Sequence, residues 1–181
     1  MQYLPKNDLS KLFRVMHAKS FIHHQIALLA FFTGTRISQA LNVRGEDIFQ
    51  KDGKWVILIR AAKRGNIVVH SLHVDQDPAF DMTPLISLAA TKGQSLVFGG
   101  TSRQYFNLRL KHYGELAGIH SSYLHSHVFR HSVAVVIFDK TQRIGAVSQF
   151  LGHRSPSSAF VYLKENSGRR AQEAVDSLQL A

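Results

Sequence analysis

Apolar positions recur at helical spacing over most of the chain, and only a central stretch departs from this period. The spacing predicts helices over residues 23–32, 81–90, 102–117, 126–139, 143–151 and 157–162. Asn7, Asp8 and Ser10 are of types that cap helix N-termini, so we expect the first helix to begin among them. Residues 33–35 contain a glycine that ends the second helix, and a short helix is predicted over residues 36–41.

The central stretch has the composition of β-strands. Residues 55–59 and 67–72 are rich in β-branched and aromatic side chains, and they flank the turn-like residues 63–66. A third strand is possible near residues 47–50. The pattern therefore predicts a mostly helical α+β fold with a small antiparallel sheet, and a length of 181 residues is most simply one domain over residues 1–181.

The last predicted helix carries one apolar stripe. Ala171, Ala174, Val175 and Leu178 stand at i, i+3, i+4 and i+7 within residues 168–180. Two interpretations of this stripe stay open. It packs on its own domain, or it docks onto a neighbouring protomer.

Composition narrows the class of partner. Lys and Arg number 22 against 12 Asp and Glu, and the formal charge of +10 favours a polyanion such as nucleic acid, with solubility charge as the plainer interpretation. The sequence has no cysteine, which excludes disulfides and cysteine nucleophiles. The longest apolar run, residues 26–32, is too short to span a bilayer, and no signal peptide is recognisable. We therefore expect no membrane partner and a cytoplasmic, nucleoid-associated location.

Cationic side chains and one phenol gather in the last third of the chain. His153 follows Arg130 by twenty-three residues, and Tyr162 follows His153 by nine. A phenol is a poor nucleophile at neutral pH, because its ordinary pKa is about 10. Nearby guanidinium and imidazole groups make it useful, since they stabilise phenoxide and neutralise the charge of a phosphodiester.

These residues resemble the catalytic domain of the tyrosine recombinase (phage integrase) family. The resemblance is carried by Thr33-Gly34-Thr35-Arg36-Ile37-Ser38, Asp47, Lys63, His127-x-x-Arg130-His131-Ser132, Leu151-Gly152-His153 and Tyr162. One His-x-x-Arg motif alone would be a weak signal, whereas the whole set in this order and spacing is a strong one. It extends from about residue 4 to the end of the chain and implies the family's catalytic-domain fold.

The resemblance implies that Tyr162 attacks a DNA phosphate, forms a 3′-phosphotyrosyl bond and releases a 5′-hydroxyl. Arg36 and Arg130 would clamp the non-bridging oxygens, since a planar guanidinium forks onto phosphate. The phosphotyrosyl bond conserves energy, so neither ATP nor another cofactor nor a metal ion is implied. The sequence contains no P-loop and no carboxylate cluster for magnesium.

Proton transfer is assigned by the same resemblance. Lys63 would protonate the leaving 5′ oxygen, His127 would assist at the nucleophile, and His153 would donate a hydrogen bond to the phosphate. Arg60 and Arg64 flank Lys63 and are alternatives for its role.

Plainer interpretations exist for several residues. Arg36 could brace its own helix, and Tyr162 could be ordinary helical core. His127 and His131 are four residues apart, so on a helix they would share a face and could bind a metal ion, although the family expects both histidines there.

The chain departs from the family pattern in two respects. Gln39 stands where many members carry glutamate, three residues after the first arginine. The chain also begins where the catalytic domain begins, so the N-terminal core-binding domain is expected to be absent, either in an excised piece or in a natural minimal enzyme.

The function expected is site-specific cleavage and rejoining of double-stranded DNA, by a free monomer that forms a homotetramer on two synapsed sites. The alternatives are a type IB topoisomerase-like nicking enzyme and a non-catalytic DNA-binding regulator of the same fold.

Overall fold

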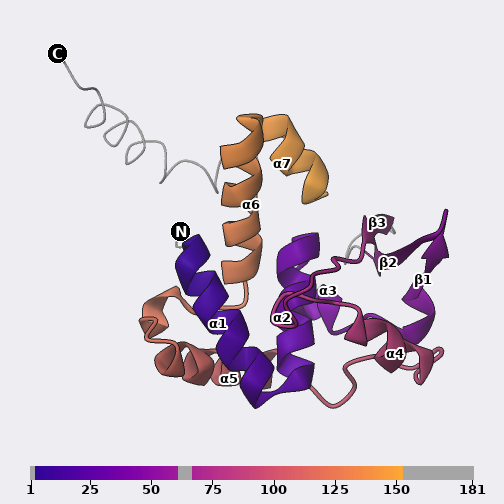
Figure 1. Ribbon diagram of the computed structural model, residues 1–181, viewed down its shortest axis with the longest axis horizontal. Helices are drawn as coiled ribbons and strands as arrows, with labels where there is room; N and C mark the ends of the chain where they lie inside the picture. Colours follow the sequence, from indigo (N-terminus) through magenta and orange to yellow (C-terminus); the bar gives the residue numbers. More distant parts are fainter. Residues whose placement is uncertain (1–2, 61–66, 153–181) are drawn as a thin grey trace.

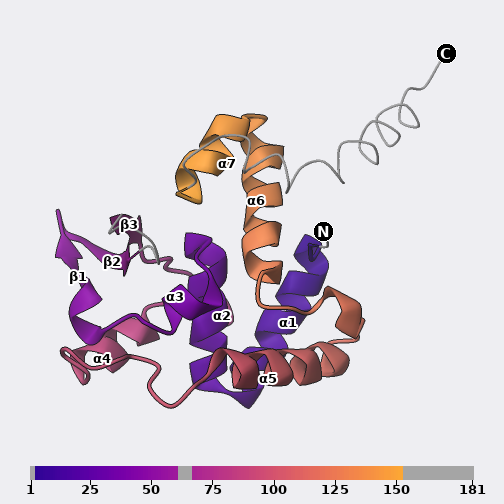
Figure 2. The same cartoon turned by 180° about the vertical axis from the view of Figure 1, so that it is seen from behind.

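The computed structural model describes residues 3–60 and 67–152. Figures 1 and 2 show a helical part on one side of the molecule, a small sheet on the other, and α2 and α3 between them. The α-helices are α1 (Lys6–Lys19), α2 (Phe21–Thr33), α3 (Ile37–Ala40), α4 (Pro84–Ala90), α5 (Arg103–Leu116), α6 (Val128–Thr141) and α7 (Ile144–Phe150). Two short 3₁₀ turns are η1 (Gly45–Asp47) and η2 (Ser121–Tyr123).

The predicted antiparallel sheet is confirmed, including its third strand. Its order is β1-β2-β3, formed by β1 (Ile48–Lys51), β2 (Lys54–Arg60) and β3 (Ile67–Ser71). Asp52 and Gly53 join β1 to β2 with positive φ angles of 49° and 72°, the combination that a two-residue hairpin turn requires. Arg60 pairs with Ile67, so these two residues are the stems of the segment that contains Lys63.

The starts of α1 and α4 differ from the predicted ones. α1 begins at Lys6, directly after Pro5, and no side chain caps it; the expected cap among residues 7–10 is therefore wrong. The proline ring holds φ at a helix-compatible value of −58°, and Asp8 in the first turn faces the positive end of the helix. α4 begins at Pro84 rather than at Asp81.

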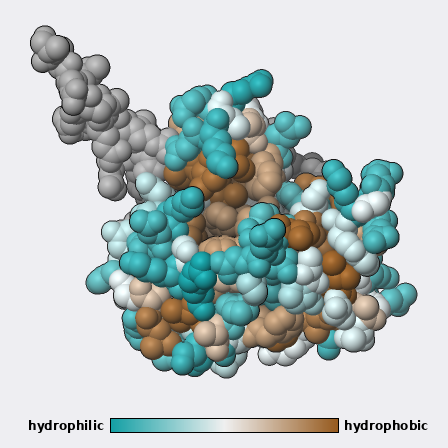
Figure 3. Space-filling view, viewed as in Figure 1, coloured by the Kyte–Doolittle hydropathy of each residue, from teal (hydrophilic) through white to brown (hydrophobic). Residues whose placement is uncertain are grey.

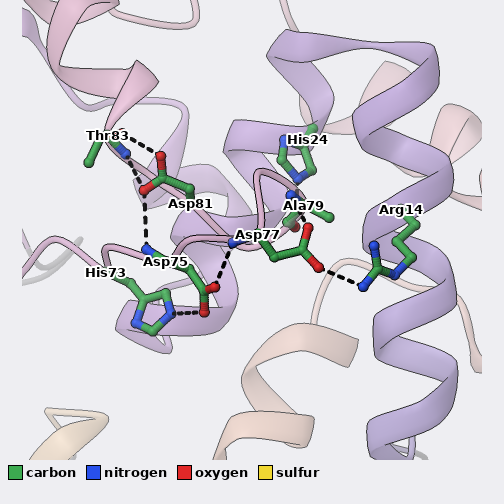
Figure 4. Close-up of polar contacts among 8 residues, drawn as sticks. All are labelled: Arg14, His24, His73, Asp75, Asp77, Ala79, Asp81 and Thr83. Atoms are coloured by element: carbon green, nitrogen blue, oxygen red, sulfur yellow. Dashed lines mark hydrogen bonds and ion pairs between the residues drawn. The ribbon is translucent and has the colours of Figure 1, made fainter.

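Asp81 lies outside α4 because its carboxylate organises the preceding loop. It accepts the backbone N–H of Thr83 at 3.1 Å and that of Asp75 at 3.4 Å. Asp77 accepts the backbone N–H of Ala79 at 3.0 Å and pairs with Arg14 of α1 at 2.6 Å (Figure 4). These contacts tie the loop between β3 and α4 to the first helix.

Local signals set the ends of α2 and α5 as predicted. α2 ends at Gly34, whose φ is 63°, and α5 begins after Ser102, whose hydroxyl accepts the N–H of Tyr105 at 3.1 Å. Predicted helices 126–139 and 143–151 correspond to α6 and α7.

The core lies among α1, α2, α5 and α6. Its largest fully buried side chains include Phe13, Phe106, Tyr113 and Phe129, and Phe13 stacks on Phe129 at 5.8 Å. A second, smaller cluster joins α6 to α7 through Val133, Ala134, Val147 and Leu151. Figure 3 shows hydrophobic surface gathered around these two helices. The second cluster seats α7 against the helix that carries the histidine–arginine motif.

Three predicted segments, residues 63–66, 157–162 and 168–180, lie wholly outside the described residues. Within residues 3–60 and 67–152, no helix combines the length and apolarity needed to cross a membrane.

Candidate active site

The first turn of α6 presents the histidine–arginine motif. His127 precedes the helix, and its backbone N–H donates to Nδ1 of His125 at 3.2 Å. Ser132 donates to the carbonyl of Val128 at 2.8 Å and accepts the N–H of Leu4 at 2.9 Å. The start of the chain therefore braces this turn from behind, and Arg130 and His131 are buried within it.

Arg130 links three sequence motifs that are distant along the chain. Its Nη1 donates to the carbonyl of Gly34 at 2.5 Å, and its Nη2 donates to the carbonyl of Leu151 at 3.0 Å. Only 3% of the residue is exposed. One guanidinium thus holds the first arginine motif and the Leu151-Gly152-His153 motif against α6.

Gly34 is required at this junction for two reasons. Its φ of 63° lies in the left-handed region, and a Cβ placed there would lie 2.5 Å from Cδ2 of Leu151. The motif around Arg36 can approach α7 this closely only because no side chain is present.

Arg36 and Arg130, the two arginines that the resemblance assigns to phosphate binding, line one pocket. Arg36 is exposed and forms the N-cap of α3, whereas Arg130 is buried behind it. A pocket of about 90 Å³ is lined by Thr33, Thr35, Arg36, Gln39, Ile59, Val68, His70, Arg130, Phe150, Leu151 and Gly152. A cationic pocket of this kind has the charge and donors to hold a phosphate.

Three arginines act electrostatically on His127. Burial lowers its pKa first, and the charges of Arg36, Arg130 and Arg103 lower it further. The imidazole is therefore neutral at pH 7, and a neutral imidazole can accept a proton. Arg103, at the start of α5, was not identified from the sequence, because it belongs to no motif and only the packing of α5 brings its charge near His127.

His131 supports the motif from the interior. Burial lowers its pKa to about 3, with His125 and His127 adding to the shift. Its ring lies 6.1 Å from that of His127 and 5.6 Å from that of His125. Among residues 3–60 and 67–152, no three His, Asp or Glu side chains form a group that could hold a metal ion.

His70 is a second residue that sequence reasoning did not single out for the site. It lines the Arg36–Arg130 pocket from β3, and its ring meets that of Phe150 edge-on at 5.4 Å. Burial lowers its pKa. The signal that could have found it is its position on β3, the strand that follows Lys63 in the chain.

Three predicted catalytic residues, Lys63, His153 and Tyr162, lie outside the described residues. The structure does describe residues close to His153 and Lys63 in the chain. Gly152, which lines the pocket, immediately precedes His153. Arg60, the last residue of β2, stands three positions before Lys63.

The comparisons with known proteins identify the family of this chain. The model of the family described as "Phage integrase family" matches residues 2–169. The chain belongs to this family. The resemblance inferred from the sequence motifs is thereby confirmed.

Curated relatives of this family member are tyrosine recombinases. It is 24% identical over 171 residues to tyrosine recombinase XerH of Campylobacter jejuni, an alignment that covers 89% of this chain and 48% of XerH. It is also 24% identical over 184 residues to tyrosine recombinase XerA of Pyrococcus furiosus, covering 98% of this chain and 62% of XerA. The chain thus spans about half the length of XerH.

Solved structures confirm the predicted fold. XerH bound to its palindromic difH substrate, in a post-cleavage complex, superposes with a TM-score of 0.76 at 20% identity, covering 96% of this chain and 52% of that one. The catalytic domain of bacteriophage HP1 integrase superposes with a TM-score of 0.67 at 18% identity, and the match covers 99% of this chain and 96% of that one.

Proposed function

We propose that residues 1–181 act as a single catalytic domain that cleaves and rejoins DNA at specific sites through a covalent 3′-phosphotyrosyl intermediate. The observation that carries the proposal is the pocket lined by both Arg36 and Arg130, since Arg130 also holds the three sequence motifs together. Membership of the phage integrase family and the relatives named as tyrosine recombinases support the same reaction.

The phosphate binds first, between an exposed and a buried guanidinium. Arg36 meets the DNA from solvent, and the charge of Arg130 acts from a site that excludes water, where electrostatic attraction is stronger. The clamp neutralises the phosphodiester and stabilises the charge of the transition state. His153, next to Gly152, adds a hydrogen bond to the phosphate.

Strand cleavage then exchanges one phosphoester bond for another. The Oη of Tyr162 attacks phosphorus, the bond from phosphorus to the 5′ oxygen breaks, and Lys63 gives that oxygen a proton. His127 takes the phenol proton, a role that its lowered pKa favours because the ring is neutral at pH 7. Attack by a 5′-hydroxyl reverses these steps and rejoins a strand. The arginines and Lys63 supply the charge, so the reaction is proposed to need no metal ion or other cofactor.

Double-stranded DNA is the proposed substrate. The net charge of +10 supplies attraction to phosphates along the duplex. Arg103, exposed at the start of α5, adds positive charge that acts on His127. A DNA substrate implies a cytoplasmic, nucleoid-associated location.

Assembly follows from the reaction. Two protomers cut one duplex site, so recombination between two sites requires a homotetramer on DNA, formed from free monomers. One neighbour in structure is a lambda integrase tetramer on a Holliday junction, which supports this arrangement. Partly buried apolar side chains of α6 and α7, namely Ile137, Phe138, Ile144 and Phe150, are a proposed contact area for a neighbouring protomer.

The test is the covalent intermediate. Wild-type protein and Tyr162→Phe are incubated with nicked duplexes that trap the cleaved strand, and adducts are separated on a denaturing gel. Wild type should form an adduct that peptide mapping places on Tyr162. Tyr162→Phe should bind the same DNA and form none, because only the phenol oxygen is lost.

The matched control is Tyr123→Phe, which removes a hydroxyl from a residue that is 38% exposed; it should form adduct like wild type. An adduct on another tyrosine would disprove the assignment. A DNA-binding regulator would form no adduct at all. Products joined from two sites distinguish a recombinase from a topoisomerase-like enzyme, which would only relax a supercoiled plasmid.

A further inference from the structure

Arg60 ends β2 in an ion pair with a buried carboxylate. Its Nη1 donates to Oδ1 of Asp47. The two partners differ in environment, since the side chain of Asp47 is 2% exposed and that of Arg60 is 51% exposed. The other oxygen of Asp47 accepts the backbone N–H of Arg44 at 2.9 Å. Asp47 is therefore anchored from behind, and Arg60 is the residue that it holds in place.

The backbone of Arg60 is held from a second direction by Gln39. The amide nitrogen of Gln39 donates to the carbonyl of Arg60 at 3.1 Å. The amide oxygen of Gln39 accepts the backbone N–H of Arg36 at 3.2 Å and the hydroxyl of Thr35 at 3.3 Å. One side chain thus connects the first clamp arginine to the end of β2.

Beside its pairing with Ile67 of β3, this end of the strand is open on one side. A hollow of about 510 Å³ opens beside it, lined by residues that include Gln39, Asn42, Arg44, Asp47, Leu58 and Arg60. Polar contacts from Gln39 and Asp47 supply the restraint that side-chain packing does not.

We propose that Arg60 is a positioning residue, which through Asp47 and Gln39 fixes where β2 ends relative to Arg36 and so where the chain delivers Lys63, three residues later. The inference rests on the proposed function, because it assigns Lys63 to the leaving group. The inference also argues against Arg60 as the group that protonates the leaving 5′ oxygen, a role for which the sequence left it as an alternative to Lys63. The guanidinium of Arg60 is instead paired with the carboxylate of Asp47.

The test uses Arg60→Gln and Asp47→Asn, which break the ion pair from either side. The control is Arg14→Gln, which removes one positive charge and one Arg–Asp pair at a distant place on α1 (Figure 4). Each protein is given saturating duplex of two kinds. One carries the normal phosphodiester, and the other carries a 5′-bridging phosphorothiolate, whose sulfur leaves without a proton. Thermal melting checks that each variant is folded.

Arg60→Gln should cleave normal DNA about 10–100-fold more slowly than wild type, the size expected when a catalytic group is displaced by about 1 Å. On the phosphorothiolate it should approach the wild-type rate, because the displaced proton donor is no longer needed. Asp47→Asn should behave in the same way, and Arg14→Gln should match wild type on both substrates. If Asp47→Asn is unfolded, Arg60→Gln decides, since its side chain is half exposed.

A double variant supplies the second readout. Lys63→Ala should abolish the effect of Arg60, so that Lys63→Ala with Arg60→Gln is no slower than Lys63→Ala alone. A further loss in the double variant, or a slow Arg60→Gln that the phosphorothiolate does not rescue, would overturn the inference. So would an Arg60→Gln that cleaves normal DNA at the wild-type rate. Failure of wild type to form any adduct would instead overturn the proposed function, and this inference with it.

Discussion

Replacing Arg130 by lysine keeps a positive charge but removes the geometry that joins three motifs. The guanidinium donates to two carbonyls, those of Gly34 and Leu151, from a residue that is 3% exposed. A lysine ammonium lacks the planar fork whose two nitrogens reach these carbonyls, so at least one of the two contacts should be lost or weakened. Hydrogen bonds from charged groups contribute about 1.5–3 kcal/mol each, so the free energy of unfolding should fall by about 2–4 kcal/mol.

Arg36→Lys is the matched comparison. Arg36 is exposed, and its guanidinium makes no hydrogen bond or ion pair to any residue within 3–60 and 67–152. Its replacement by lysine should therefore change the free energy of unfolding by less than about 0.5 kcal/mol. Both variants should nevertheless lose cleavage by about 100–1000-fold, because each removes a guanidinium that we propose binds the phosphate in the transition state.

Urea unfolding measures the stability of each variant, and the rate of adduct formation at saturating DNA measures cleavage. The assays are run at a temperature where Arg130→Lys remains folded, so that loss of cleavage is not loss of structure. Equal stability of the two variants would refute the joining role of Arg130. Wild-type cleavage by either variant would show that its arginine does not clamp the phosphate.

Two further predictions concern stability. Gly34→Ala should destabilise the fold by about 2–4 kcal/mol, because the new Cβ would lie 2.5 Å from Leu151 and an alanine is also strained at a φ of 63°. Gly53→Ala is the control: its φ is 72° but the space around its Cβ is open, so it should destabilise the fold by only about 1–2 kcal/mol. Equal losses in urea unfolding would contradict the crowding argument. His131 has a pKa of about 3 in the fold and an ordinary value near 6.5, so its contribution to stability is full above pH 6.5 and falls by about 1.4 kcal/mol per unit as pH drops toward 3. The free energy of unfolding, obtained from urea unfolding at several pH values between 3 and 6.5, should therefore change less steeply with pH in His131→Gln than in the wild type. An unchanged slope would show that another group is responsible.

Local signals in the sequence determined most of the secondary structure. Gly34 ends α2 and Ser102 begins α5 where the sequence predicts, because a left-handed glycine and a capping hydroxyl act within one turn of the chain. The start of α1 was mispredicted, because Asn7, Asp8 and Ser10 could each cap a helix, whereas the helix begins directly after Pro5. The hairpin turn at Asp52 and Gly53 was a readable signal that the strand prediction did not use.

The sequence by itself also identified the family and the candidate residues Arg36, His127 and Arg130, since the spacing of reactive side chains is a property of the chain. What these side chains contact was decided only by the tertiary structure. Arg130 meets a carbonyl ninety-six positions away, Arg60 pairs with Asp47, and Arg103 acts on His127. No local pattern encodes such pairs, because they arise when packed helices and strands bring distant backbone groups and charges into a water-poor interior, where an interaction strong enough to orient a side chain can form.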